Sequence, residues 1–545
     1  MTSFIADYEE FTPQQEALLD RYVTNTRGSI FALRNLPEVI KGALFSRYSR
    51  SALGLRSLLL KEFIQNADET GFQTIVQEAP QAEAQLIAIK KAQNFYDRIL
   101  DGYGDDSIGE LGGAHLAIEN ISMLAAKGIE DSRIGGSPLE KSTRYIYFDQ
   151  KVKGEYLFYR EPVLMTSAYR DLYLNTCNML FDTYSSLIPP LTEYMERNFP
   201  KGEEVSKSAY SAAIRAKVLD CVRGLLPAST LTNMGMFANG RFFEYLLHKL
   251  HVSPLVELQD IGKRSYEELS KVIPSFVRRA DMSHRHCQAW MNFAESTRDN
   301  LAALANQHSP QVLFEKSPGV RLVASDPDAK YKVAAALLYP YCSRGFTELL
   351  EYVRRVPEEE FAKILDGAVF SRQNRRHKSP RATENAVMTF EIVADFGAYR
   401  DLQRHRVGTQ ERQLLTCDLG YVEPFEIEAC GLANKYREAL DKAKEAFDHI
   451  AKELPEEAQY IVPMAYNIRW YFTSNLRALQ WMCELRSIPQ GHAAYRAVAQ
   501  QMARLAVENE PSFERFFSFV DYSSHDIGRL EQEERAAKKK AVGIV

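Results

Sequence analysis

Apolar side chains recur at helical spacing in two long stretches of the chain. The first stripe comprises Tyr169, Leu172, Tyr173, Cys177, Leu180, Phe181, Tyr184 and Leu187. The second comprises Tyr436, Leu440, Ala443, Phe447 and Ile450. Because residues three and four apart share one face of a helix, each stripe predicts a core-facing helix. We expect the first helix to stop at Pro189-Pro190 and the second to end near Pro455, since proline removes a helical hydrogen bond.

Strict alternation of apolar and polar residues predicts a strand in the second half. Met388, Phe390 and Ile392 alternate with their neighbours and lead through Gly397 toward Arg404-His405-Arg406. The polar, proline-containing segment 307–330 is the best linker candidate. We therefore expect an α+β chain, in which antiparallel sheet is flanked by long helices, with domains at 1–306 and 331–545. The charged run 531–540 fits a solvated helix face or a tail.

Three pairs of segments resemble each other, which indicates an internal duplication. The pairs are Ala43–Arg50 with Ala336–Arg344, Asp106–Glu110 with Pro380–Glu384, and Val222–Leu246 with Ala458–Met482. In the last pair a single offset aligns Pro227 with Pro463, Asn239 with Asn475, and Arg241 with Arg477. Solenoid repeats run about 20–50 residues, whereas these segments are spread over whole halves of the chain. We infer that one domain was duplicated and that the copies diverged.

Composition narrows the class of protein. The 545 residues are 45% hydrophobic and 11% aromatic, which is incompatible with a mainly disordered chain. Lys and Arg number 67 against 72 Asp and Glu, so a general nucleic-acid binder is disfavoured. No apolar run reaches the ~18 residues of a membrane helix, and the N-terminus lacks a signal-peptide core. Seven scattered cysteines without a CxxC pair argue for reduced thiols, and we expect a cytoplasmic protein.

Two polar constellations are candidates for binding chemistry. In an extended segment Glu140, Ser142 and Arg144 project to one face, which could bind a phosphorylated sugar or form a surface ladder of ion pairs. Arg404-His405-Arg406 needs an anion or carboxylates to offset its charge, unless its arginines cap helix carbonyls. His284-Arg285-His286-Cys287 lacks further ligand spacing, so we expect no metal site.

Taken together, these segments resemble the flavin-dependent thymidylate synthases. Family members carry RHR, then seven further residues, a serine and, two residues after it, an arginine. They also carry an upstream H-x-[ST]-x-x-E-H block and, downstream, A-R-x-x-L-P and N-x-R followed by a late arginine. The matching pieces here are Glu140–Tyr145, Arg404–Arg406, Asp106–Glu110, Arg223–Pro227, Asn239–Arg241, Asn475–Arg477 and Arg486. The resemblance covers most of the chain, in two divergent copies.

Each copy keeps what the other has lost. The first has Asp131-Ser132-Arg133 in place of RHR and Leu250 in place of the late arginine. The second has Leu414 and Thr416 for the expected serine and arginine, and Gln459 for the A-R-x-x-L-P arginine. Because the family builds its nucleotide site between subunits, one complete composite site remains and its mirror image is dismantled.

The resemblance implies roles for these residues. It assigns the pyrimidine nucleotide to Glu140, Ser142, Arg144, Arg223, Asp401, Arg404 and Arg486, with Arg144 and Arg223 on the phosphate and with Arg486 and Ser142 as the catalytic pair. It assigns FAD to Ser107, Glu110, Asn239, Arg241, His405, Arg406, Asn475 and Arg477. Methylenetetrahydrofolate and NADPH would be co-substrates in the C5 methylation of dUMP. Since the family forms tetramers of single domains, two fused copies imply a homodimer.

Two departures leave other interpretations open. Asp401 stands where the family has a glutamine, and the upstream histidine is Asp105 in the first copy and Ser379 in the second. A carboxylate only accepts hydrogen bonds, so Asp401 could change the preferred base. The alternatives are therefore a flavoenzyme of the same build that acts on another pyrimidine nucleotide, and a non-catalytic protein that binds nucleotide or flavin.

Overall fold

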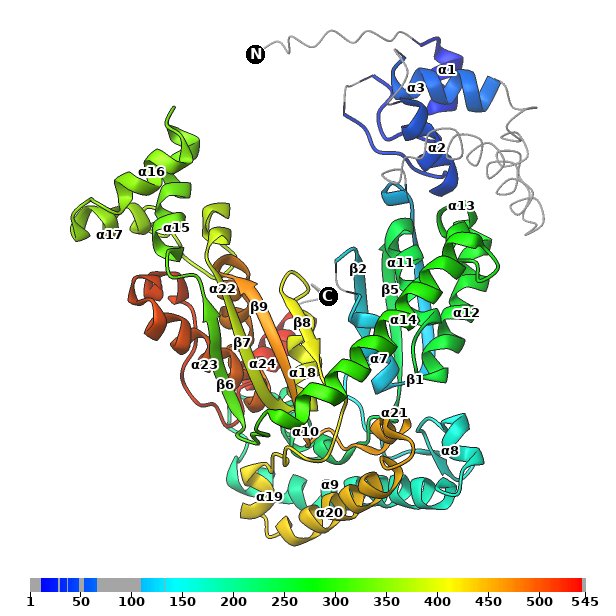
Figure 1. Ribbon diagram of the computed structural model, residues 1–545, viewed down its shortest axis with the longest axis vertical. Coiled ribbons are helices and arrows are strands. Elements are labelled where there is room, and N and C mark those ends of the chain that lie inside the picture. Colours follow the sequence, from blue (N-terminus) through cyan, green and yellow to red (C-terminus); the bar gives the residue numbers. More distant parts are fainter. Residues whose placement is uncertain are drawn as a thin grey trace. The chain divides into compact units, whose positions relative to one another are not determined.

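The computed structural model describes residues 11–27, 30–36, 38–48, 53–65, 109–132 and 134–541 (Figure 1). The described chain divides into two compact units. The first contains residues up to 119 together with 134–140 and 233–312, and the second contains 120–133, 141–232 and 313–545. None of the described helices is both long and apolar enough to cross a bilayer. Mixed helix and antiparallel sheet confirm the α+β prediction.

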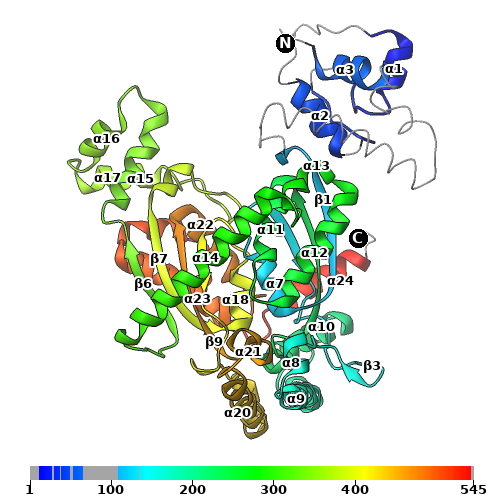
Figure 2. The ribbon, with the colours of Figure 1, turned by 45° about the vertical axis from the view of Figure 1, so that its right-hand side comes forward.

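The first unit is built on a three-stranded sheet. Its order is β1 (Gly113–Ser122), β5 (Leu231–Asn239), β2 (Gly136–Glu140), and β2 runs antiparallel to β5 with Glu140 opposite Met234. Figure 2 shows α11 (Gly240–His251) and α12 (Val256–Val272) along these strands. The described part of the unit also contains α1 (Pro13–Leu19), α2 (Glu38–Tyr48), α3 (Leu55–Leu58), the π-helix η1 (Leu59–Gln65), α13 (Pro274–Val277) and α14 (Arg285–His308).

The second unit contains a four-stranded antiparallel sheet. Its order is β6 (Gly319–Ser325), β7 (Val387–Asp395), β9 (Asn467–Asn475), β8 (Thr409–Arg412). Strand β7 confirms the strand predicted from alternation, because Met388, Phe390 and Ile392 are buried. Helices α22 (Leu476–Arg486) and α23 (Ala493–Asn509) pack against the sheet. Strand β6 lies inside the segment predicted as a linker, and the domain boundaries stay a prediction.

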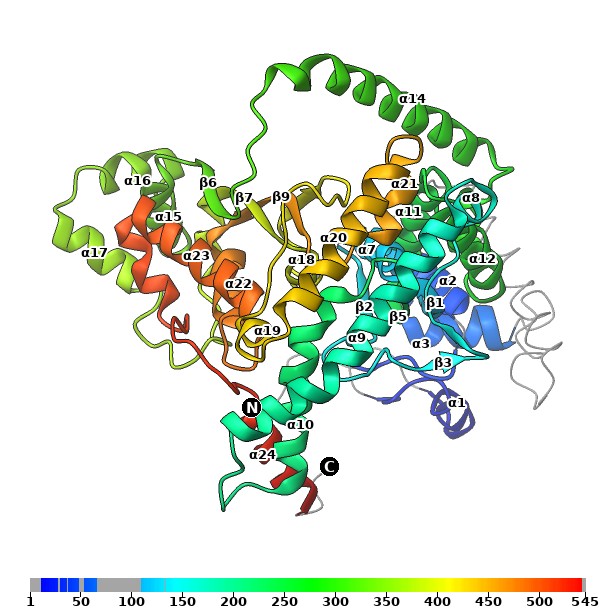
Figure 3. The ribbon, with the colours of Figure 1, turned by 90° about the horizontal axis from the view of Figure 1, so that it is seen from below.

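Two long helices pack side by side in the second unit, α9 (Arg170–Asn198) and α20 (Ala433–Ile450) (Figure 3). Helix α20 covers the predicted apolar stripe and ends at Ile450, before the expected end near Pro455. The prediction that the first helix stops at Pro189-Pro190 was wrong, since α9 continues to Asn198 through both prolines. Leu191 and Met195, beyond the prolines, are fully buried. Their burial offsets the cost of the missing helical hydrogen bonds.

Shorter elements complete the second unit. Its other helices are α7 (Met123–Glu130), α8 (Pro162–Thr166), α10 (Lys207–Val222), α15 (Ala329–Leu338), α16 (Phe346–Val353), α17 (Glu358–Asp366), α18 (Phe396–Leu402), α19 (Phe425–Ala429), α21 (Pro455–Ala458) and α24 (Leu530–Ala541). A small hairpin joins β3 (Lys151–Val152) to β4 (Glu155–Tyr156). The predicted solvated run 531–540 lies in α24.

The longest predicted repeat has the same order of elements in both copies. A short 3-10 turn, a strand and a helix follow each other as η3 (Arg223–Leu225), β5 and α11, and again as η8 (Gln459–Ile461), β9 and α22. The bounds of β5 and β9 differ by the same 236 residues that align the sequences. In both copies an asparagine, Asn239 or Asn475, caps the following helix through its side chain. The duplication read from the sequence is thus matched by the structure.

Candidate functional site

Four arginines that lie far apart in the sequence gather in the second unit. Arg223 begins η3 directly after α10, Arg404 follows α18, and Arg486 is the last residue of α22. Arg144 completes the cluster. All four act electrostatically on the carboxylate of Asp401, which lies near the C-terminal end of α18. We refer to Arg144, Arg223, Arg404, Arg486 and Asp401 as the arginine cluster.

Arg144 is held by a buried ion pair. Its Nε and Nη2 each donate to a different carboxylate oxygen of Asp220, both at 2.6 Å. Its Nη1 donates to the carbonyl oxygen of Gln490 at 3.2 Å and lies 3.4 Å from the Tyr495 hydroxyl. Although burial raises the pKa of Asp220, the Arg144 guanidinium more than offsets this and holds that pKa well below its usual range. Two-pronged pairing fixes the plane of the guanidinium.

Asp401 is held more loosely than Asp220. One of its oxygens lies 3.8 Å from Nη1 of Arg223, and the other lies 3.6 Å from Nη1 of Arg486. Its side chain keeps 21% exposure, against 5% for Arg223 and 15% for Arg486. Burial raises the pKa of Asp401, but Arg223, Arg486 and the other two arginines lower it below its ordinary value. The carboxylate therefore stays ionised and open to a hydrogen-bond donor.

Arg223 is a buried cation with more N–H donors than there are acceptor atoms around it. Its Nη2 is buried and has no hydrogen-bond partner among the residues that the structure describes. Gly397 permits its close approach to α18, because a Cβ there would lie 3.1 Å from Nη2. Asp395 caps α18 by accepting from the Ala398 N–H at 2.9 Å, and its second oxygen is also buried without a partner. An unsatisfied buried guanidinium donor is costly, and this one has the capacity to bind an anion or a carbonyl oxygen.

Arg486 is oriented by a neutral histidine. Its Nε donates to Nε2 of His405 at 2.9 Å, and its guanidinium lies over the ring of Tyr495, 5.5 Å from the centroid. Burial and then the charge of Arg486 hold the pKa of His405 well below its ordinary value. His492 also stays neutral, because burial and then Arg223 lower its pKa to about 3. Neither histidine adds positive charge near neutral pH.

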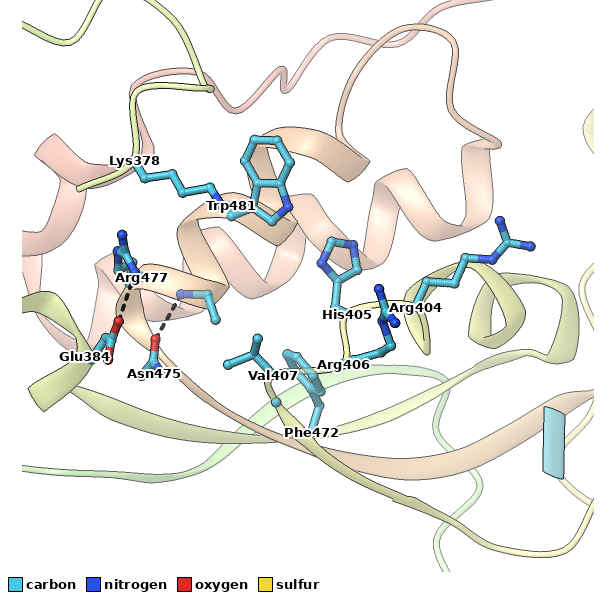
Figure 4. A pocket seen from close by; sticks show the side chains of 12 residues that line it. Lys378, Glu384, Arg404, His405, Arg406, Val407, Phe472, Asn475, Arg477 and Trp481 are labelled. Atoms are coloured by element: carbon cyan, nitrogen blue, oxygen red, sulfur yellow. Dashed lines mark hydrogen bonds and ion pairs between the residues drawn. The ribbon is translucent and has the colours of Figure 1, made fainter. Parts of the chain in front are cut away.

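A cavity of about 360 Å³ adjoins this cluster through Arg404 and His405. It is lined by Lys378, Glu384, Arg404, His405, Arg406, Val407, Gly408, Phe472, Asn475, Arg477, Ala478 and Trp481. Figure 4 shows Arg404, His405 and Arg406 on one side and Arg477 with Trp481 on the other. The structure thus brings together four of the residues that the resemblance assigns to FAD: His405, Arg406, Asn475 and Arg477.

The N-x-R arginines form the same ion pair in both copies. Nη1 of Arg477 donates to Glu384 at 2.9 Å, and Nη1 of Arg241 donates to Glu110 at 2.9 Å in the first unit. The pairs differ in burial, since the side chain of Arg477 is 32% exposed and that of Arg241 is 56% exposed. Arg477 also donates from Nε to the Ser379 carbonyl at 2.8 Å. These contacts support the predicted equivalence of Glu110 with Glu384.

Not every predicted residue joins the cluster. Glu140 ends β2 in the first unit, with Asn239 and Arg241, whereas Ser142 lies in the second unit, where its hydroxyl accepts from the Arg144 N–H at 3.3 Å. Ser107 lies outside the described residues. Gln459, the counterpart of Arg223, is buried and accepts from the Leu415 N–H at 3.1 Å. Among the described residues, His, Cys, Asp and Glu side chains form no group of three that could hold a metal.

The sequence did not single out Asp220, Tyr495 or His492. Asp220 precedes Arg223 by three residues on α10, and this acid–base spacing was the available signal. Tyr495 lies between two of the arginines, with its ring 6.0 Å from the Arg144 guanidinium and 5.5 Å from that of Arg486. A tyrosine on an amphipathic helix carries no sequence signal for such a role.

The family model of the thymidylate synthase complementing proteins matches residues 62–275 and again 321–512. A UPF0159 protein of Chlamydia pneumoniae is 56% identical over 527 residues, which cover 97% of this chain and 98% of its own. A UPF0159 protein of Thermoplasma acidophilum is 34% identical over 530 residues, covering 92% and 99%. A crystal structure of a UMP/dUMP methylase from Streptomyces cacaoi bound with 5-Br dUMP matches 38% of this chain and 98% of its own, at 20% identity and a TM-score of 0.30.

The two matched segments agree with the repeated order of elements and with the paired N-x-R sites. The chain therefore belongs to the thymidylate synthase complementing protein family, of which it carries two divergent copies in tandem.

Proposed function

We propose that the protein is a flavin-dependent enzyme that methylates C5 of dUMP to give dTMP, with one composite site per chain. Family membership supports the class of reaction. The observation that carries the proposal is the buried Nη2 of Arg223, which has no partner among the described residues and lies in a cluster of four arginines. A nucleotide would supply the missing acceptors. Arg144 and Arg223 derive from the first copy, and Arg404 and Arg486 from the second.

The charge of the cluster suits an anionic ligand. Four arginines face the carboxylates of Asp220, Asp401 and Asp395. The lowered pKa values of His405 and His492 mean that neither histidine adds to the charge of the cluster. Guanidinium groups bind phosphate through paired N–H donors, and this cluster offers both buried and exposed ones. Arg144 is already paired with Asp220, so we assign it to the wall of the site and leave contact with the ligand to the other three arginines.

The cavity beside the cluster fits a flavin nucleotide by the chemistry of its lining. Arg404, Arg406 and Lys378, together with Arg477 beside its partner Glu384, can bind a pyrophosphate, while Trp481 and Phe472 offer flat apolar surface to a ring. When bound there, FAD would supply the transfer of the one-carbon unit and of hydride, with methylenetetrahydrofolate and NADPH as co-substrates. The chain itself would hold both ligands and exclude water.

Arg486 is the residue best placed to activate the base. Its guanidinium is fixed on one edge by His405 and on one face by Tyr495, so its Nη groups point toward Asp401 with little freedom. A preorganised cation at a carbonyl oxygen of uracil stabilises the negative charge that develops as C5 becomes nucleophilic. Ser142, beside Arg144, is proposed as its catalytic partner. The homodimer and the cytoplasmic location remain proposals.

The proposal is tested by reconstituting the reaction. Purified protein incubated with FAD should become yellow and retain flavin through gel filtration. With methylenetetrahydrofolate and NADPH it should release tritium from [5-³H]dUMP and form dTMP. Arg486→Ala should reduce this release about a hundredfold or more, whereas Arg535→Ala, at an exposed pair with Glu531, should leave it unchanged. Flavin binding without tritium release from any pyrimidine nucleotide would favour the non-catalytic alternative.

A further inference from the structure

The three side chains Arg223, Asp401 and Arg486 form a row in which a carboxylate stands between two guanidinium groups. Each guanidinium approaches a different oxygen of Asp401, at 3.8 Å from Arg223 and at 3.6 Å from Arg486. Both separations exceed hydrogen-bond distance, so neither arginine donates a hydrogen bond to Asp401. Arg144, in contrast, donates to Asp220 at 2.6 Å. Among the described residues, Asp401 accepts no side-chain hydrogen bond. The row therefore presents donor, acceptor and donor in that order.

We propose that this row reads the imide edge of a uracil base and that Asp401 is the residue that selects uracil over cytosine. The inference rests on the proposed function, and it concerns the class of base rather than the reaction. Uracil presents a carbonyl, an N3–H and a second carbonyl along this edge, which is acceptor, donor, acceptor. Every group then meets its complement. This places Arg223 on the base instead of on the phosphate.

Cytosine mismatches the same row of donors and acceptor at two positions. Its N3 is an acceptor that would face the ionised carboxylate of Asp401, and its exocyclic amine is a donor that would face a guanidinium. A site that leaves buried polar groups unpaired against the wrong ligand discriminates much more strongly than an apolar pocket does. An amide at position 401 would lose this discrimination, because it can turn either its oxygen or its nitrogen toward N3.

The surroundings hold the row in place. His405 accepts from Nε of Arg486 at 2.9 Å, which leaves the Nη groups of Arg486 to face Asp401. Arg223 is almost fully buried, and Nη1 is the guanidinium atom that faces Asp401. Asp401 is fixed within α18, whose first turn is capped by Asp395. Three charged groups on three separate elements thus converge without direct hydrogen bonds to one another.

Calorimetric titration of the full-length protein in the presence of FAD tests the inference. Wild type should bind dUMP at least tenfold more tightly than dCMP, and N3-methyl-dUMP should bind at least tenfold more weakly than dUMP. Asp401→Asn, a substitution of equal size, should bring the dUMP-to-dCMP ratio down about tenfold. Asp401→Ala should bind N3-methyl-dUMP as well as dUMP. Asp418→Asn, at an exposed ion pair with Lys444, is the control and should keep the wild-type ratio.

The outcomes separate this inference from the proposed function. Equal binding of dUMP and dCMP by wild type, or tolerance of N3 methylation, would overturn the role of Asp401 while the enzyme could still methylate its substrate. The wild-type titrations decide this even if an Asp401 variant fails to fold. A flavin ring also carries an imide edge, so a loss of FAD affinity in Asp401→Asn with unchanged dUMP-to-dCMP ratio would overturn the assignment to uracil. Absence of binding by every pyrimidine nucleotide would defeat both proposals.

Discussion

Pro227 and Pro463 hold the same place in the two copies and face each other as an antiparallel bridge in the second unit. Main-chain hydrogen bonds extend the contact on both sides, from Ala228 N–H to the Val462 carbonyl at 2.9 Å and from Ala465 N–H to the Gly224 carbonyl at 2.8 Å. The copies therefore join through their equivalent segments. Because Arg223 directly precedes Gly224, this junction places a first-copy arginine among residues of the second copy.

Substitution of Gly224 should disturb this junction. A Cβ at Gly224 would overlap the hydroxyl of Tyr436 and lie 3.0 Å from Cβ of Ala465. Overpacking of a well-packed core costs about 1–3 kcal/mol, so Gly224→Ala should lower the free energy of unfolding by that amount and weaken dUMP binding as Arg223 shifts. Urea denaturation and calorimetry provide the two measurements. Gly235→Ala, where a Cβ meets nothing within 4 Å, is the control. Equal stability of the two variants would contradict the prediction.

Arg144 and Asp220 should be energetically coupled. Their side chains are 9% and 15% exposed, and loss of one partner leaves a charge buried. Arg144→Ala should therefore destabilise the protein by about 3–5 kcal/mol, and the double variant Arg144→Ala with Asp220→Asn should lose less than the sum of the single variants. Urea denaturation of the four proteins of this cycle measures the coupling. Strict additivity would show that the pair contributes nothing, and Arg535→Ala at an exposed pair provides the baseline.

Asp395 should make stability depend on pH in an unusual direction. Burial raises its pKa from 3.8 to about 6, although the charge of Arg223 lowers it. The folded state thus binds this proton more tightly than the unfolded state, and the stability gained from the protonated form is lost as pH rises from about 4 to about 6. Asp395→Asn keeps the helix cap without the charge, since asparagine is an equally good cap.

The Asp395→Asn variant should gain about 1–3 kcal/mol of unfolding free energy at about pH 8 and show no gain at about pH 4. Urea denaturation of wild type and variant across this range measures the difference. A pH-independent difference between the two proteins would contradict the prediction. Asp418→Asn, on the surface, should show no comparable trend.

Arg477 and Arg241 allow a matched test of flavin binding. Both pair with a glutamate at 2.9 Å, but Arg477 lines the cavity together with Arg404, His405 and Arg406, whereas the first copy has no RHR sequence. Arg477→Ala should weaken FAD binding about tenfold or more, because a charge-assisted hydrogen bond to phosphate contributes about 1.5–3 kcal/mol. Arg241→Ala should have a smaller effect. Fluorescence quenching of FAD on titration measures both, and an equal or reversed order would contradict the assignment.

The sequence by itself determined the elements that depend on local pattern. Helix α20 and strand β7 follow from the spacing of apolar residues, and one offset of 236 residues anticipates the equivalent strands β5 and β9. The expectation that proline ends a helix failed at Pro189-Pro190, where the burial of Leu191 and Met195 outweighs the local preference of proline. Local rules are reliable where the tertiary environment reinforces them and fail where long-range packing opposes them.

The residues of the candidate site divide in the same way between what the sequence and what the tertiary structure determined. Arg223, Asp401, Arg404 and Arg486 could be singled out from motif spacing, but only the tertiary structure brings Arg223 of the first copy to the other three, next to the junction at Pro227 and Pro463. Only the tertiary structure decided that Arg144 is closed onto Asp220 while Asp401 stays open between two arginines. Nothing in the sequence distinguishes the carboxylate of Asp220 from that of Asp401. They differ because distance and burial set the strength of an ion pair, and both are fixed by segments more than 70 residues apart, as with the 76 residues between Arg144 and Asp220.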